Sequence, residues 1–149
     1  MAVDIVAKVA YQRDGTHFAM MDLKSKDDNG ASLKFSLTVA AAFVFDLAVA
    51  KASYTGPVEK LPGIIAANIS RILYAGGREM VAMITARSPS GSAMLDSVLI
   101  EPADVSIESV DSYDVIMKEV FDYTKPDTPM QTNKIVNKTL SRTSKRKSI

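Results

Sequence analysis

The sequence predicts one domain of the α+β class in which β-strands dominate. We expect an antiparallel β-sandwich or barrel of about six or seven strands, with one or two helices on its flank. Apolar residues make up 47% of the 149 residues, enough for a buried core. Several short segments alternate between apolar and polar residues, and the turn sequences Asp-Gly and Asn-Gly separate the first of them.

Residues 1–38 are predicted to form a three-stranded meander. The first strand carries an apolar row on one side, formed by Ile5, Ala7, Val9 and Tyr11. Asp14-Gly15 follows and predicts a hairpin, because both positions of such a turn need a positive φ. We expect the return strand at 17–26, a second turn at 27–30 and a third strand at 31–37.

Two segments in the middle of the chain are predicted to be helical. Thr38 is a candidate N-cap for residues 38–53, where the alanines favour a helix. The run FVFDLAV within that segment leaves a strand open. The clearest helix covers 61–77, with Pro62 in its first turn and Gly76-Gly77 at its end. Its predicted buried stripe consists of Ile65, Ile69, Ile72 and Leu73.

Three further strands are expected in the second half, at 78–87, at 94–110 with a break at Pro102, and at 112–125. One face of the last strand carries an apolar row of Tyr113, Val115, Met117, Phe121 and Tyr123. Its other face carries two large aliphatic side chains, Ile116 and Val120. A strand with apolar groups on both faces is sandwiched or contacts a partner, so we predict that Ile116 and Val120 contact a partner.

The charge of the chain divides it into two parts. Residues 1–127 carry 12 Lys and Arg against 17 Asp and Glu, a charge of −5. Residues 128–149 carry 6 Lys and Arg and no acid, a charge of +6. We therefore predict a single β-rich domain at 1–127 and a basic C-terminal arm at 128–149, which attract each other within one chain or between copies.

The arm is expected to bind acidic protein rather than only phosphate, because it also carries apolar residues. We predict that 134–140 dock by apolar contact and 142–147 by charge. The predicted contact residues are Lys134, Ile135, Val136, Lys138, Leu140, Arg142, Lys145, Arg146 and Lys147.

The sequence carries no constellation typical of nucleophilic catalysis. The chain has no cysteine, which excludes disulfides, thiolate metal sites and cysteine nucleophiles. His17 is the only histidine and follows the Asp-Gly turn, so we interpret it as a solvated turn residue rather than a general base. A single histidine also cannot build a typical zinc site.

The acidic residues have structural explanations as well. Asp27, Asp28 and Asn29 resemble the start of a calcium loop, but with Gly30 sixth the twelfth residue is Ser36 instead of a carboxylate. Three acids close in sequence are expected on a solvated strand face: Glu101, Asp104 and Glu108. We therefore predict no catalytic residue, no metal site, no cofactor and no enzymatic activity.

Three segments carry a resemblance to a known family: the start MAVDI, the central helix LPGIIAANISRILYAGG and the final strand SYDVIMKEVFDYTKP. With these the chain resembles phage tail-tube proteins and the Hcp protein of type VI secretion. The resemblance implies rings of subunits that stack into a tube, with strands on the inner wall and terminal arms between subunits. The favoured function is thus a structural protein that self-assembles into a homomultimer, a component of a phage-like particle or injection machine, with its own copies and other assembly proteins as partners.

The alternative is a nucleic-acid-binding domain. The order of three strands and a helix in residues 1–53 resembles single-strand-binding proteins of the Whirly type, and the basic arm would contact phosphates. The N-terminus lacks the pattern of a signal peptide, and no apolar run reaches the length of a membrane span. A virion or cytoplasmic location is expected.

Overall fold

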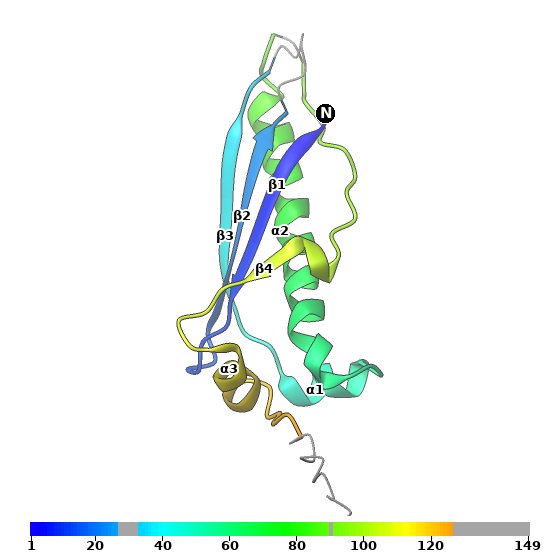
Figure 1. The fold of residues 1–149 in the computed structure, drawn as a ribbon. Helices are drawn as coiled ribbons and strands as arrows, with labels where there is room; N and C mark the ends of the chain where they lie inside the picture. Colours follow the sequence, from blue (N-terminus) through cyan, green and yellow to red (C-terminus); the bar gives the residue numbers. More distant parts are fainter. Residues whose placement is uncertain (27–32, 90, 127–149) are drawn as a thin grey trace, which may run out of the picture.

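The computed structural model describes residues 1–26, 33–89 and 91–126 (Figure 1). The strands are β1 (Val3–Ala10), β2 (His17–Ser25), β3 (Ser36–Phe43) and β4 (Val105–Ile107). The helices are α1 (Leu47–Ser53), α2 (Leu61–Thr85) and α3 (Tyr113–Glu119), with short 3-10 turns at Val58–Lys60 and Pro102–Asp104.

The four strands form one open sheet in the order β3-β2-β1-β4. β2 pairs antiparallel with both β1 and β3, whereas β4 pairs parallel with β1. The predicted hairpin is confirmed, but its turn is longer than expected: residues 11–16 connect the strands, the N–H of Gly15 donates to the carbonyl oxygen of Gln12 at 3.3 Å, and of the Asp-Gly pair only Gly15 has a positive φ, 87°. The predicted sandwich or barrel is wrong, because residues 78–85 and 113–119, counted as strands, are helical.

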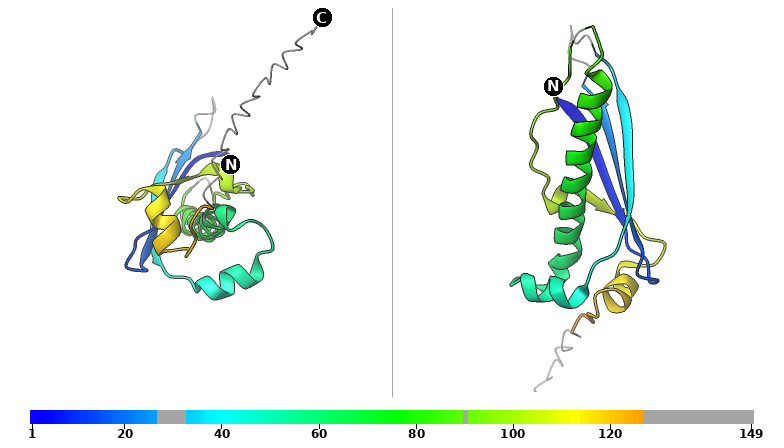
Figure 2. Two further views of the ribbon diagram at one scale, coloured as in Figure 1. Left: turned by 60° about the horizontal axis from the view of Figure 1, so that its bottom comes forward. Right: turned by 180° about the vertical axis from the view of Figure 1, so that it is seen from behind.

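α2 covers one face of the sheet along its length (Figure 2). The inner side chains of β1 and β2 are buried against it, among them Val9, Met21 and Leu23. The hydroxyl group of Tyr11, at the end of β1, donates to the carbonyl oxygen of Pro62 at 2.5 Å. The core of the domain therefore lies between one helix and one sheet, rather than between two sheets.

α2 continues past Gly76-Gly77, where the sequence predicted its end. Val81 and Thr85 continue the spacing of the buried positions, so residues 78–85 gain more from covering the sheet than from pairing as a strand. Gly77 faces the sheet, where a Cβ atom would lie 2.6 Å from Cδ1 of Leu23. The glycine thus allows a close approach instead of ending the helix. The predicted buried stripe was wrong at Ile72, whose side chain is 66% exposed.

The sequence left a helix or a strand open for residues 38–53, and the structure contains one of each in this region. β3 takes the first part, and α1 begins after Asp46. The carboxylate of Asp46 accepts from the N–H of Val49 at 3.1 Å and caps the helix. Thr38, the predicted cap, lies within β3 and donates to Asp22 of β2 at 2.6 Å.

Residues 92–100, here called the strap, run along α2 in an irregular conformation toward β4. Side chains of α2 hold the strap backbone through four hydrogen bonds. The hydroxyl oxygen of Thr85 accepts from the N–H of Ala93. Arg78, Tyr74 and Arg71 donate to the carbonyl oxygens of Leu95, Asp96 and Ile100, respectively. The predicted strand at 94–110 is correct only for Val105–Ile107, because side chains of α2 engage the strap backbone instead of a neighbouring strand.

α3 replaces the last predicted strand. Ile116 and Met117 of α3 are buried, and so is Phe121, which lies in the turn after the helix. The ring of Phe121 stacks on Phe45 at 5.5 Å and meets the edge of Tyr11 at 5.1 Å. α3 therefore closes the end of the core beside the β1–β2 hairpin.

Candidate assembly surfaces

His17 lies inside the molecule and not in solvent, contrary to the sequence-based interpretation. Its side chain is 3% exposed, and its Nδ1 accepts from the backbone N–H of Gln12 at 3.0 Å. The rings of Tyr11 and Phe45 lie 5.2 and 5.1 Å away. Burial lowers the pKa of His17 and raises the pKa of Tyr11. The neutral ring acts as a hydrogen-bond acceptor that holds the hairpin closed.

The acidic residues near β4 have partners of their own. Asp104 accepts from the N–H of Glu101 at 2.8 Å and caps the 3-10 turn. Glu108 forms an ion pair with Lys8 at 3.3 Å. Within the described ranges, no three His, Asp or Glu side chains gather as metal ligands would. Asp27, Asp28 and Asn29 lie outside the described residues.

The predicted partner contacts divide into two groups. Ile116 is 1% exposed and Val120 is half-buried against the core, so their interpretation as an outward apolar pair is wrong. Both were assigned to the outside of a strand, whereas the helical backbone turns them inward. The contact residues in the arm, Lys134 to Lys147, lie outside the described residues and stay a prediction.

Sequence reasoning missed an apolar surface on the side of α2 that faces away from the sheet. We call it the outer helix face, and it consists of Ile72, Ala75, Gly76, Met80 and Met83. Ile72 and Met83 are 66% and 76% exposed. No other described element covers this side of the helix over most of its length (Figure 2). The signal was available in part, because residues 61–85 carry more apolar residues than one buried stripe requires, although Asn68, Arg71 and Glu79 interrupt the exposed side.

A hollow of about 280 Å³ joins the outer helix face to the strap. Ala75 and Ala82 of α2 form its floor, and Met94 and Leu95 lie on the strap side. Arg78 and Glu79 also line it, and by its helical spacing Glu79 lies among the apolar residues of the outer helix face. Met94 is 64% exposed and extends the apolar surface beyond the helix.

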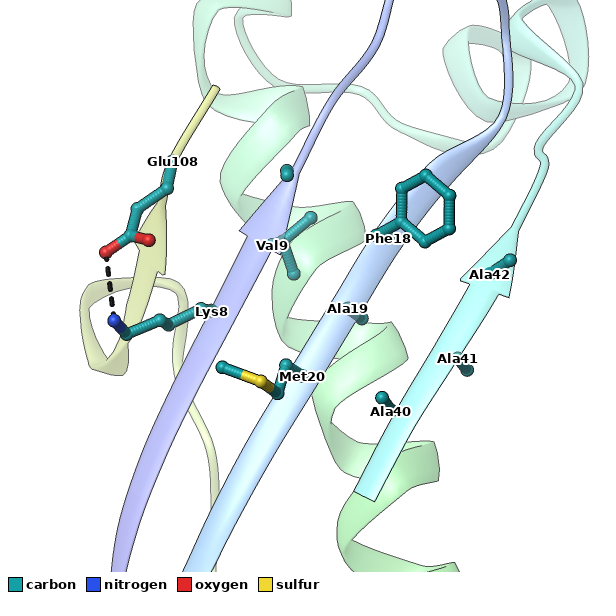
Figure 3. Close-up of a pocket in the computed structure, with 10 residues that line it drawn as sticks. Lys8, Val9, Phe18, Ala19, Met20, Ala40, Ala41, Ala42 and Glu108 are labelled. Atoms are coloured by element: carbon teal, nitrogen blue, oxygen red, sulfur yellow. Dashed lines mark ion pairs between the residues drawn. The ribbon is translucent and has the colours of Figure 1, made fainter. Parts of the chain in front are cut away.

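The second apolar surface is the face of the sheet opposite α2, called the outer sheet face (Figure 3). Phe18 and Met20 of β2 point outward beside Ala40 and Ala42 of β3 and border a hollow of about 480 Å³. The Lys8–Glu108 ion pair closes one side of it. The other end of the same face is polar and carries Asp4, Asp22, Lys24 and Thr38.

No family model, no curated protein and no solved structure matches this chain. None of the described helices combines the length and the apolar character that crossing a membrane requires.

Proposed function

We propose that this protein is a non-enzymatic structural protein that assembles with copies of itself, and that the outer helix face is its main contact. The observation that carries the proposal is that α2 exposes large apolar side chains, Ile72, Met80 and Met83, on the side away from the sheet, although Glu79 lies among them. One side already covers the sheet, and large apolar side chains grouped on an exposed surface are typical of a contact with another protein. A second copy provides the matching apolar surface without requiring another protein.

The arrangement that suits the outer helix face is an antiparallel pair of α2 helices related by a two-fold axis. Such an axis at Gly76, near the middle of the 25-residue helix, brings Ile72 against Met80 of the partner subunit. The absence of a side chain at Gly76 allows the two backbones to approach closely, and no atom within 4 Å fills that space in the single chain. The flexible methionine side chains adapt to the partner surface.

The test is to place a charge on the outer helix face and measure the mass in solution. Met83→Glu puts a carboxylate into the proposed contact, while Val110→Glu makes a comparable change at a residue that is fully exposed and remote from α2. Size-exclusion chromatography with light scattering should give a multiple of 16.1 kDa for the wild type and for V110E, and a smaller species for M83E. A wild-type chain that is monomeric at every concentration would exclude the proposal.

The shape of the assembly would distinguish a tube from a closed particle of fixed size. A tube or a stack of rings is what the resemblance to tail-tube proteins implies, and negative-stain electron microscopy of the wild type tests it. Discrete particles of one small size would support assembly but contradict the tube.

A further inference from the structure

The free edge of β3 is a second surface suited to pairing. β3 is the terminal strand of the sheet, and within residues 33–89 and 91–126 no strand pairs with its far side. Natural proteins protect such an edge with charges, proline, bulges or a covering element, because unpaired N–H and C=O groups recruit other strands. The strand SLTVAAAF has eight residues, with no charge, no proline and no glycine.

The inner face of β3 is incompletely covered. On β2 the inward side chains His17, Ala19, Met21 and Leu23 are all buried. On β3 the corresponding side chains are only partly buried, namely Leu37, Val39, Ala41 and Phe43. The apolar layer therefore continues to β3 at the edge of the sheet, where no further described strand covers it.

The lack of charge on β3 favours a second copy over another partner. When a strand pairs with an identical strand around a two-fold axis, any charge near the axis meets a like charge, which destabilises the pair. β1 carries Asp4 and Lys8, and β2 carries Asp22 and Lys24, whereas β3 carries no charge. Among the three long strands, β3 alone combines a free edge with side chains that tolerate pairing with themselves.

We propose that β3 pairs antiparallel with β3 of a second copy, so that the sheet continues from one subunit into the next. Directly opposed residues in an antiparallel pair share a face of the sheet, which limits the register. A two-fold axis at Ala40 brings Leu37 opposite Phe43 of the partner subunit, and Val39 opposite Ala41 of the partner subunit. This register pairs the four half-covered inner side chains of β3 with one another. An axis at Val39 would instead bring Phe43 opposite Phe35 of the partner subunit, and cross-linking distinguishes the two registers.

The absence of cysteine allows a direct test by disulfide cross-linking of the full-length chain. In the proposed register Ala40 meets its own copy on the outer sheet face, and the Cα atoms of opposed residues in an antiparallel pair lie about 4.5–5.5 Å apart, within the range of a disulfide. Ala40→Cys should form a linked dimer rapidly on mild oxidation. Val6→Cys, an exposed position on the same face of β1, is the matched control and should react at least tenfold more slowly.

The register is tested with two variants that should link only to each other. Thr38 lies opposite Ala42 of the partner subunit, so a mixture of Thr38→Cys and Ala42→Cys should give the heterodimer faster than either variant forms a homodimer. Preferential linking of Thr38→Cys with Ala40→Cys would instead place the axis at Val39 and overturn the proposed register. Both variants are exposed single substitutions and remain informative if Ala40→Cys does not fold.

Pairing at β3 and pairing at the outer helix face are separable. The Ala40→Cys cross-link should form equally in the Met83→Glu background, because residue 83 lies on α2. If Ala40→Cys reacts no faster than Val6→Cys while Met83→Glu still reduces the mass of the wild type, the edge pairing is excluded and the helix contact remains. If the cross-link forms but Met83→Glu leaves the mass unchanged, the helix contact is excluded and the edge pairing remains.

Discussion

Gly77 of α2 lies directly over Leu23 of β2, so that a Cβ atom at residue 77 would be 2.6 Å from Cδ1 of Leu23. Leu23 is fully buried, and Val39 lies 3.6 Å from the same position. The leucine side chain therefore has little room to move aside. This contact sets how closely the main helix approaches the sheet.

The two adjacent glycines should respond in opposite ways to alanine. Gly76→Ala adds a methyl group where no atom of the same chain lies within 4 Å, so under conditions that keep the chain monomeric it should stabilise the helix by up to about 1 kcal/mol. Gly77→Ala gains the same propensity but forces a methyl group into the core, at a cost of about 1–3 kcal/mol. Urea unfolding of both variants checks this, and equal stability of the two would contradict the close approach.

Acid should destabilise the fold through His17. Because burial lowers its pKa in the folded chain, the unfolded chain binds the proton more readily below the ordinary pKa of 6.5. The free energy of unfolding should be unaffected by this group above about pH 7 and fall as the pH drops through 6. His17→Phe fills the aromatic cluster without a titrating group, so its unfolding should show a weaker dependence between pH 7 and 5. An unchanged pH profile in this variant would assign the effect to other groups.

Thr85 should contribute more to the stability of the fold than a residue of its size usually does, because its side chain connects α2 to the strap. Its hydroxyl group donates to the carbonyl oxygen of Val81 and accepts from the N–H of Ala93, both at 2.7 Å. Thr85→Val leaves the N–H of Ala93 without this acceptor and should cost about 1–2 kcal/mol, while Thr85→Ser keeps it. Ser70 provides the contrast, since its buried hydroxyl group has no partner among the described residues. Thermal unfolding should therefore show no loss for Ser70→Ala.

The basic arm should strengthen assembly in a salt-dependent way. A chain that ends after Pro126 should form smaller species than the full chain at low ionic strength, because a charge of +6 no longer attracts an acidic domain of −5. Sedimentation at about 0.05 M and 0.5 M salt checks this, since screening removes the difference. Replacement of Ile135, Val136 and Leu140 by serine separates the apolar part of the predicted docking from the charged part.

Comparing the full chain with the chain that ends after Pro126, at low and high salt, also tests the nucleic-acid alternative. Binding of a single-stranded oligonucleotide that weakens steeply with salt and disappears on truncation would assign the arm to phosphate. The outer sheet face adds no basic surface to the arm, because Lys8, Lys24 and Lys26 are balanced by Asp4, Asp22 and Glu108 on and beside it.

Local chemistry alone determined the first part of the fold. The first hairpin, the alternation in residues 3–10 and 17–25, and the helix start at Pro62 depend on neighbours in sequence, and each was predicted correctly. The split of charge between the domain and the arm is likewise a property of the sequence.

Tertiary structure decided the elements whose apolar pattern suits a strand and a helix alike. Residues 78–85 and 113–119 are short and apolar, and their conformation depends on which surface they cover. The sheet requires a long helix over its inner face, which makes Gly77 a close contact instead of a helix end and turns Ile72 outward. His17 was misplaced for the same reason, because Phe45 and Phe121, far along the chain, enclose the hairpin that local sequence would leave in water.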